Sequence, residues 1–324
     1  MAHLNNRVKP LRLIRDMSCP AVLLLAAAVG LALSVWSNGA RSIAGQLITP
    51  FLMLVLFSIF TRVSLTRLRE AVRDRQYLLT AMGLNFVSTP FVAFFLGWLF
   101  LRDYPSLWVG LMLALVTPCT DWYLIFTDLA GGDLHRNLAL LPWNLILQLV
   151  LLPVYLFLLT QKLVPVELST LARAFALYVV IPLTGAQLLR WYRPQVAASE
   201  RFSRLGFAAL GLTVMAMFTS HGEIFLKNPT LFLRMAPPML SFYIISISLS
   251  RIVSRLLHFP RERFIALACT TTARNSPLAL PLAVVLFPDH PIIALSQLIE
   301  PVLEIPSLIL FSSLVRVRVQ KTKI

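Results

Sequence analysis

The stretch VTPCTDWYLIF at residues 116–126 continues the apolar run LWVGLMLALV at residues 107–116. A proline, a cysteine, two threonines and an aspartate thus interrupt a segment that is otherwise typical of a membrane-spanning helix. Broken helices and carboxylates are costly in hydrocarbon, because unpaired backbone groups and charges find no water there. A second apolar segment is interrupted in the same way by TTTARNSP at residues 270–277. The fold must therefore provide partners for two sets of polar groups inside apolar segments.

The composition places the chain among membrane proteins. Of its 324 residues, 58% are hydrophobic and only 13% are charged, and the mean hydropathy is +0.78, whereas soluble domains carry about 25% charged residues. Hydrocarbon about 30 Å thick is crossed by about 20 apolar residues in a helix. The sequence therefore predicts an all-α polytopic membrane protein. Its ten expected transmembrane helices are residues 17–36, 43–62, 77–101, 106–130, 136–160, 169–190, 204–221, 231–254, 263–288 and 291–315.

The basic residues predict how these segments are oriented. With a cytoplasmic N-terminus, most of the 29 lysines and arginines lie on the cytoplasmic side and Arg274 falls inside a segment. Because short cytoplasmic loops are enriched in Lys and Arg, we expect both termini in the cytoplasm and the protein in the cell membrane. The same distribution accounts for the net charge of +15 without nucleic acid as a partner. The cations expected outside are Arg41, Arg102, Lys162, Arg173, Lys227 and Arg234.

The ten segments divide into two sets of five. Residues 1–160 contain the first five and residues 161–324 the second five, within a single membrane domain. An odd number of crossings gives the two halves opposite orientations, which is the condition for an inverted repeat. The interruptions fall in the fourth segment of each half, and interrupted segments in corresponding positions point to a transporter site. The simpler alternative is that Pro118 and Pro277 are ordinary kinks.

We expect helices 4 and 9 to be broken near residues 117–121 and 271–276 and to cross each other. A break exposes the positive end of one half-helix and the negative end of the other. Ser276 and Pro277 fit a helix start, with serine as the N-cap and proline at the first helical position. In the fourth segment, Thr120 and Asp121 fit the same role. Two such starts would line a small polar cavity with N–H groups and hydroxyls.

Two opposite charges lie inside the predicted membrane region. Asp121 and Arg274 would each cost at least about 2.5 kcal/mol if exposed to lipid at mid-depth. We expect them to be neighbours, because pairing lowers this cost. The pair serves either transport or only the structure of the crossing. Uncharged polar residues in other segments are expected to form hydrogen bonds between helices, namely Asn85, Asn144, Gln148 and Gln187.

The tenth segment adds two carboxylates in SQLIEPVLEIPS, residues 296–307. Gln297, Glu300 and Glu304 share one helix face by their spacing, and the two prolines of this stretch each remove a backbone hydrogen bond. A carboxylate among apolar residues favours its neutral form, which suits a group that takes up and releases protons. Glu304 is the stronger candidate, because Glu300 is equally compatible with a solvated position near the outer surface.

These features together resemble a known superfamily. Ten helices in two inverted sets of five, with broken and crossing fourth and ninth helices, are similar to the bile acid, arsenite and riboflavin transporter superfamily. Two short motifs resemble its arsenite efflux permeases. One is Cys119 in TPCTDWYLIF, and the other is Glu304 followed by an aliphatic residue and proline in LEIP. The resemblance implies an antiporter that extrudes trivalent arsenic or antimony in exchange for protons.

The resemblance also implies roles for individual residues. Cys119 would contact the substrate and Glu304 would carry the coupling proton, with Glu300 next in line. Trivalent arsenic is thiophilic and a thiol is a soft ligand, so one thiol with hydroxyls from Thr117 and Thr120 would bind weakly enough to release. Without the resemblance, the simpler interpretation of Cys119 is a small buried hydrophobic residue. The expected substrate-binding residues are Cys119, Thr117, Thr120, Asp121, Arg274 and Asn275.

The chain also departs from the pattern of the superfamily. The permeases usually carry a basic residue just before the cysteine, where this chain has Pro118. They lack an aspartate two positions after it, where this chain has Asp121. Sodium-coupled bile acid carriers usually have a Gln-Asn pair in the ninth helix, and the matching pair here is Arg274 and Asn275. A fixed cation repels sodium, so we expect protons rather than sodium as the coupling ion.

Other classes of function are less consistent with the sequence. An enzyme is not expected, because GxSxG, HExxH and Gly-rich phosphate motifs are absent from the sequence. The three cysteines match no zinc pattern, so neither a metal site nor a cofactor is expected. The remaining alternative is a sodium- or proton-coupled carrier of a small organic anion, with Arg274 facing the carboxylate. Either function implies a small solute, a coupling ion and the lipid bilayer as partners.

Overall fold

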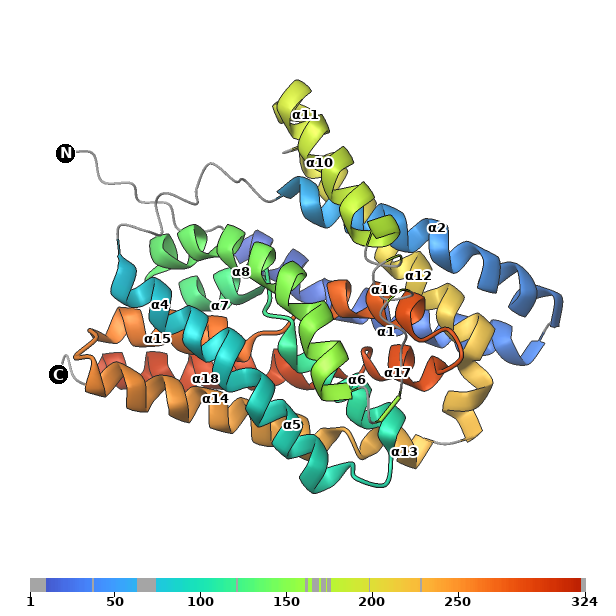
Figure 1. The fold of residues 1–324 in the computed structure, drawn as a ribbon. Coiled ribbons are helices and arrows are strands. Elements are labelled where there is room, and N and C mark those ends of the chain that lie inside the picture. The colour runs from blue at the N-terminus through green and yellow to red at the C-terminus, as the bar shows by residue number, and fades with distance from the viewer. Residues whose placement is uncertain are drawn as a thin grey trace.

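The computed structural model describes residues 10–36, 38–62, 74–120, 122–160, 163–164, 169, 173, 176–197, 199–227 and 229–321, which form a bundle of helices (Figure 1). The long elements in chain order are α1 Pro10–Trp36, α2 Asn38–Arg62, α4 Arg75–Gly83, α5 Thr89–Phe100, α6 Pro105–Val116, α7 Trp122–Ala130, α8 Leu134–Tyr155, α10 Ile181–Tyr192, α12 Glu200–Lys227, α14 Ala236–Leu256, α15 Arg261–Thr272, α16 Ser276–Leu286 and α18 Glu300–Lys321. The short ones are α11 Pro194–Ala197, α13 Pro229–Leu233, α17 Pro291–Ser296 and the π-helices η2 Leu84–Ser88, η3 Leu156–Thr160 and η4 Ala176–Val180.

Six of the described helices are long and apolar enough to cross a membrane, namely Gly39–Thr61, Arg75–Phe100, Leu134–Leu159, Arg204–Ile224, Pro229–Leu256 and Pro291–Val315. Shorter apolar helices include Pro105–Val116 and Ser276–Leu286, which flank the two polar interruptions. Large apolar side chains such as Trp36, Phe91 and Ile244 are exposed on the surface. A soluble monomer rarely exposes so many. The chain is therefore a multi-pass, all-helical membrane protein.

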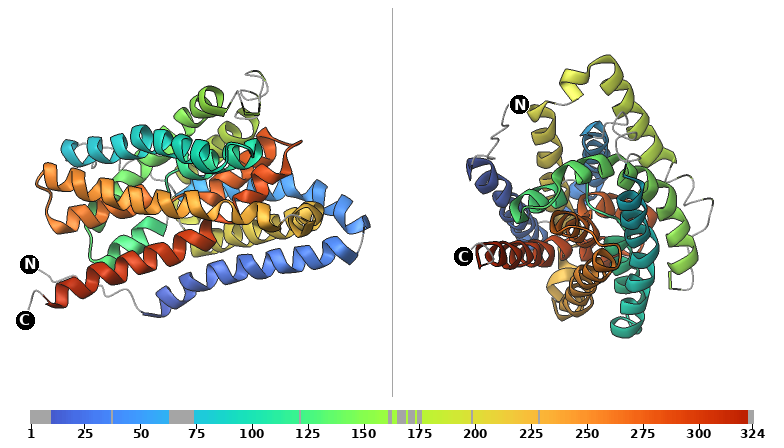
Figure 2. Two further views of the ribbon diagram at one scale, coloured as in Figure 1. Left: turned by 90° about the horizontal axis from the view of Figure 1, so that it is seen from below. Right: turned by 90° about the vertical axis from the view of Figure 1, so that its left-hand side faces the viewer.

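The helices form two packing groups. In the first, α12 packs along α1 and α2, and α10 packs against α2, so helices from both halves of the chain are mixed (Figure 2). Small residues permit this close approach: a Cβ atom on Gly30 would collide with the backbone of Met215, and one on Gly206 with Ser58. In the second group, α7 and α15 pack between α8, α14 and α18. Between the two groups, α16 contacts α2 and α17 contacts α12, and both also contact α6. Helix α6 in turn contacts α5, which packs against α14 of the second group.

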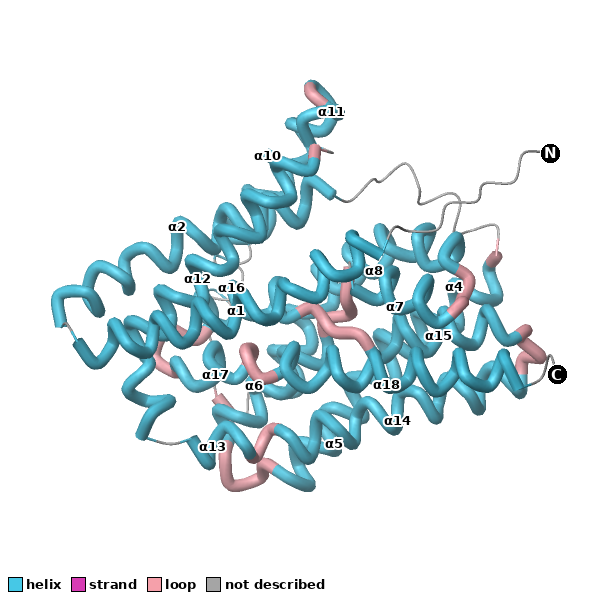
Figure 3. Tube along the Cα trace, turned by 180° about the vertical axis from the view of Figure 1, so that it is seen from behind, coloured by secondary structure: helices cyan, strands magenta, loops and turns pink. Residues whose placement is uncertain are grey.

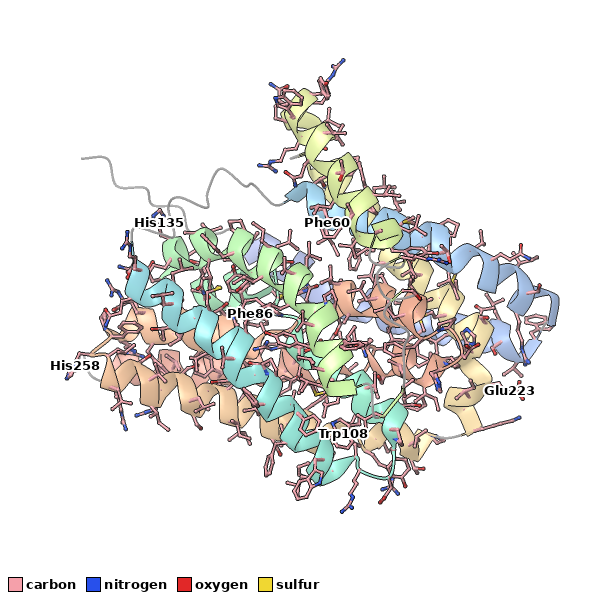
Figure 4. All side chains as sticks on the ribbon, in the orientation of Figure 1. Phe60, Phe86, Trp108, His135, Glu223 and His258 are labelled. Carbon is pink, nitrogen blue, oxygen red and sulfur yellow. The ribbon has the colours of Figure 1, made fainter. Side chains whose placement is uncertain are left out.

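Charged residues gather at the ends of the molecule. At one end, Asp74 binds Arg136 at 2.7 Å and Arg263 at 3.3 Å, which joins α4, α8 and α15. Burial by itself raises the pKa of Asp74, but the hydrogen bond from Arg136 and the nearby cations lower it overall. His135 and His258 lie at this end, and Glu223 lies at the opposite end (Figure 4). The region between the ends is therefore the apolar part that the membrane must cover.

The tenth segment spans residues 291–315, as expected, but its helix contains a local irregularity. It consists of α17 and α18, separated by a turn at residues 297–299. Pro301 explains the break, because its ring clashes with the carbonyl of the residue four positions earlier and it has no N–H to donate. The N–H groups of residues 297–299 still donate to carbonyls three positions earlier, so residues 291–315 form one apolar span, as expected. The side chains of Gln297, Glu300 and Glu304 are all buried.

Candidate functional site

The two polar interruptions lie side by side and hydrogen-bond to each other. The N–H of Cys119 donates to the carbonyl of Ala273 at 3.1 Å, and the N–H of Asn275 donates to the carbonyl of Thr117 at 2.9 Å. Pro118 and Arg274 thereby form an antiparallel bridge. Figure 3 shows the two loops meeting in the interior of the bundle. The predicted breaks in the fourth and ninth segments, and their contact, are thus confirmed.

The side chain of Arg274 holds the broken ends together. It is fully buried, and its Nη1 donates to the carbonyl of Leu115 at 3.0 Å, at the C-terminal end of α6. Its Nη2 and Nε donate to the carbonyls of Thr271 and Thr272, at the C-terminal end of α15. These carbonyls have no partner within their own helices, and a cation is favourable at the negative end of a helix dipole. One guanidinium therefore caps two helices.

An aromatic residue and a carboxylate complete the surroundings of Arg274. The guanidinium carbon lies 4.8 Å from the centre of the Phe242 ring, a cation–π contact with α14. The backbone N–H of Arg274 donates to Oε1 of Glu304 at 3.0 Å. The expected neighbour Asp121 lies outside the described residues, so its pairing with Arg274 stays a prediction. The described contacts give Arg274 a structural role that does not depend on that pair.

Polar side chains also satisfy the other broken ends. The hydroxyl of Thr117 donates to the carbonyls of Leu113 and Ala114 in the last turn of α6. The sulfur of Cys119 accepts from the N–H of Trp122, the first residue of α7, at 3.2 Å. Asp121, which was expected to share the helix start with Thr120, lies outside the described residues, so that part of the prediction is not tested. The hydroxyl oxygen of Thr120 instead accepts from the Asn275 side chain at 3.4 Å.

The helix start at α16 corrects one prediction. Asn275, not Ser276, is the N-cap, because its side-chain oxygen accepts from the N–H of Leu278 at 3.2 Å. Ser276 is the first helical residue, and its hydroxyl donates to Glu300. The sequence pattern was ambiguous because asparagine and serine are both good N-caps. In the structure the serine hydroxyl is used for the bond to Glu300, and the side chain of Asn275 provides the cap.

Both glutamates of α18 lie at the crossing. Glu304 is 3% exposed and Glu300 is 0% exposed, so the solvated alternative for Glu300 was wrong. Glu300 accepts hydrogen bonds from Ser276 and from the hydroxyl of Tyr243 at 3.3 Å. Glu304 accepts from the backbone N–H of Arg274, and it lies one helical turn from Glu300 on α18. Two acids and one permanent cation therefore share a buried site.

A row of amides extends from the crossing along α8. Asn85 in η2 donates to Asn144, which donates to Thr270 just before the second break, each at 3.3 Å. These bonds between helices agree with the prediction. Gln148 lies one turn further along α8 and is fully buried, yet no described residue bonds to either polar atom of its side chain. The predicted interhelical bond of Gln148 was therefore wrong for the part of the chain that the structure describes.

Two residues of the site were missed in the sequence. Phe242 and Tyr243 occur together in α14, where Phe242 contacts Arg274 and Tyr243 contacts Glu300. Both are buried, at 1% and 2% exposure. A tyrosine inside an apolar segment was the available signal, because its hydroxyl requires a partner when buried. The identity of that partner depended on how the helices pack.

The expected substrate-binding residues Cys119, Thr117, Thr120, Arg274 and Asn275 all belong to this crossing. The buried thiol of Cys119 shares an apolar cluster with Cys269, Tyr123 and Leu308. The crossing thus combines one thiol, hydroxyls, an amide, an arginine and two acids in a place without solvent exposure. Its chemistry suits the binding of a small polar solute and the transfer of a proton.

Comparison with known proteins defines the class. The model of the sodium bile acid symporter family matches residues 49–228, more than half of the chain, and the chain belongs to this family. It is therefore a membrane transporter of small solutes, not an enzyme. The arsenical-resistance protein Acr3 of Corynebacterium glutamicum is 24% identical over 331 aligned positions, which cover 94% of this chain and 89% of that protein.

Two further relatives agree with this class. Acr3 of Alkaliphilus metalliredigens is 25% identical over 64% of this chain and 62% of its own length. An uncharacterized transporter of Synechocystis is 22% identical over 80% of this chain and 75% of its own length. The resemblance to the arsenite efflux permeases that was drawn from the two short motifs is confirmed by the Acr3 proteins.

The assignment of Asn275 as the N-cap of α16 makes a testable prediction. Asn275→Ala should lower the free energy of unfolding by about 1 kcal/mol, because the N–H of Leu278 loses its acceptor. Thermal unfolding of the purified protein in detergent would measure this loss. Asn275→Ser is the matched control and should retain most of the stability, since serine caps nearly as well. Equal stability of the alanine variant and the native protein would rule out the cap.

Proposed function

We propose that this transporter exports trivalent arsenic or antimony in exchange for protons. The observation that carries the proposal is the position of two groups at the crossing. Cys119 is hydrogen-bonded through its backbone to Ala273, and Glu304 is hydrogen-bonded to the next residue, Arg274. The residue that offers a soft ligand, Cys119, and the carboxyl group of Glu304 are thus hydrogen-bonded to adjacent residues of one loop. The similarity to the two Acr3 proteins supports the same substrate.

The chemistry of the crossing suits a trivalent arsenic hydroxide. Its arsenic atom prefers a thiol, and its hydroxyl groups need hydrogen-bonding partners in a buried site. The unpartnered side-chain atoms of Gln148, Thr272 and Gln297 are buried polar groups on the elements around the crossing. A single thiol from Cys119 gives a bond weak enough to break in each cycle. Asp121, Thr120 and Asn275 complete the proposed substrate site.

Proton coupling is assigned to Glu304, with Glu300 as its partner. Two neighbouring carboxylates in a buried site repel each other unless one of them holds a proton. Glu304 bonds to the backbone of the second break, so a change in its charge acts directly on the loop that binds the substrate. Uptake of a proton from one side and its release on the other would then alternate with the binding of substrate.

The organic anion alternative receives less support from the geometry. It requires the guanidinium of Arg274 to face a carboxylate of the substrate. All three side-chain nitrogens of Arg274 already donate to carbonyls of α6 and α15. An anion would have to displace these bonds and uncap two helices. A buried cation at this position also disfavours sodium as the coupling ion.

We also propose the topology behind this function: two inverted five-helix repeats, residues 1–160 and 161–324, with both termini in the cytoplasm. The antiparallel bridge between the breaks and the packing of α2 against α10 and α12 support this symmetry. The start of α1 and the end of α18 point to the same end of the molecule (Figure 2). The protein would lie in the cell membrane with this end inside.

The orientation can be tested with alkaline phosphatase, which is active only outside the cytoplasm. A fusion after Tyr104, in the loop between α5 and α6, should be active because this loop is predicted to lie outside. A fusion at the C-terminus, after Ile324, should be inactive. The opposite pattern of activities would overturn the proposed orientation.

Cys119→Ser should reduce arsenite efflux by at least about tenfold, because a soft ligand worth about 1.4 kcal/mol is replaced by a hard hydroxyl. The measurement is uptake of radiolabelled arsenite by inverted membrane vesicles with an imposed pH gradient. Cys269→Ser is the matched control, since Cys269 is equally buried in the same cluster, and it should retain transport. Full activity of the Cys119 variant would remove the thiol from the mechanism.

Glu304→Gln should abolish the stimulation of arsenite transport by a pH gradient. The amide oxygen can still accept from the N–H of Arg274, so folding and insertion should survive. Initial rates in inverted vesicles with and without a gradient provide the measurement. Glu223→Gln, an exposed glutamate at the far end of the molecule, should behave like the native protein. If Glu304→Gln retains normal stimulation and Glu300→Gln loses it, the proton belongs to Glu300 instead.

A further inference from the structure

A cavity of about 670 Å³ lies away from the crossing, where α14, α15 and α18 come together. This volume is within the range of roughly 300 to 1,000 Å³ that is typical of ligand sites. The cavity reaches the connection between α14 and α15, near the end of the molecule that carries His258 (Figure 4). It therefore lies at the level where helices leave the apolar part of a membrane.

One side of the cavity is basic. Arg251 and Arg255 project from one face of α14, and Arg261 stands at the first turn of α15. None of the residues that line the cavity is acidic. Arg261 bonds to the carbonyl of Val315, while Arg251 and Arg255 form no ion pair within the described part of the chain. Three exposed cations thus face one cavity, and no described residue that lines it carries a negative charge.

The other side of the cavity is apolar. Phe264 and Phe311 lie edge to face with ring centres 6.3 Å apart, and the exposed side chain of Leu314 continues this surface along α18. A third feature is Ser254, which lines the cavity and is 3% exposed. No described residue accepts or donates a hydrogen bond at its hydroxyl. A buried hydroxyl normally has a hydrogen-bonding partner, such as a protein group, a water or a ligand.

We propose that this cavity binds an anionic phospholipid. The phosphate of the headgroup would lie among Arg251, Arg255 and Arg261 and accept from the hydroxyl of Ser254, and an acyl chain would follow the apolar side past Leu314. Basic pockets between membrane helices at the level of the headgroups are the usual sites for such lipids. Arginine suits this role because its planar guanidinium binds phosphate oxygens in pairs.

The presence of a basic side and an apolar side in one cavity favours a lipid over a soluble anion. Inorganic phosphate would use the arginines but leave the aromatic and aliphatic side of the cavity without a partner. A neutral lipid would use the apolar side but leave three guanidinium groups unpaired. An anionic phospholipid satisfies both sides in one molecule. Because α18 also carries Glu304, the bound lipid would hold the helix that bears the proposed proton carrier against α14 and α15.

The test is a lipid titration of the full-length protein purified in detergent, with bound lipids counted by native mass spectrometry. Phosphatidylglycerol should bind more tightly than phosphatidylcholine with the same acyl chains. Each interfacial arginine strengthens lipid binding by about fivefold, so the variant with Arg251→Gln, Arg255→Gln and Arg261→Gln should bind phosphatidylglycerol about 100-fold more weakly. Phosphatidylglycerol should also raise the Tm of the native protein but not that of the variant.

A matched control removes three exposed arginines elsewhere, by Arg102→Gln, Arg173→Gln and Arg193→Gln, and should bind phosphatidylglycerol like the native protein. If the triple variant at the cavity does not fold, Leu314→Trp tests the same site from its apolar side. The larger side chain should block the cavity and abolish the preference for phosphatidylglycerol. Equal binding of the two lipids by the native protein, or displacement of the lipid by an equal concentration of inorganic phosphate, would overturn the proposal.

Discussion

The buried guanidinium of Arg274 bonds to carbonyl groups at the C-terminal ends of both α6 and α15, and the remainder of the site depends on this contact. Two helices cannot end inside a membrane unless their last carbonyls find partners. Arg274 provides them for both helices at once, and its own charge is balanced by the helix ends, the ring of Phe242 and the nearby acids. The backbone on either side of Arg274 is then free to hydrogen-bond to the first break.

This arrangement explains why the polar residues of the interruptions are of such different types. Each broken end requires a particular donor or acceptor: the Thr117 hydroxyl for carbonyls of α6, the Cys119 sulfur for the first N–H of α7, and the Asn275 oxygen for α16. The proposed substrate ligands are therefore also structural groups. A substrate that binds to Cys119 or Asn275 as proposed would compete with helix capping. Binding would then be coupled directly to a change in loop conformation.

Residues of α18 also combine a structural role with a proposed functional role. Glu304 anchors the backbone of the second break, and Glu300 anchors Ser276 at the start of α16. Both carboxyl groups thus hold the loop that they would also drive by protonation. At the far end of α18 lies the basic cavity that we propose to bind a lipid headgroup. The helix that bears the acids therefore makes contact with the crossing in the middle of the bundle and, through the proposed lipid, with the membrane at its end.

The sequence alone determined the helical membrane class, the positions of both breaks and the burial of Glu304, because apolar runs interrupted by prolines and polar residues have few stable arrangements in hydrocarbon. It also indicated Cys119 through a short motif. Only the tertiary structure decided which groups meet. The bonds of Arg274 to helix carbonyls, the N-cap at Asn275 and the contact of Tyr243 with Glu300 join residues far apart in the chain. Such contacts depend on how helices pack, which local periodicity does not specify.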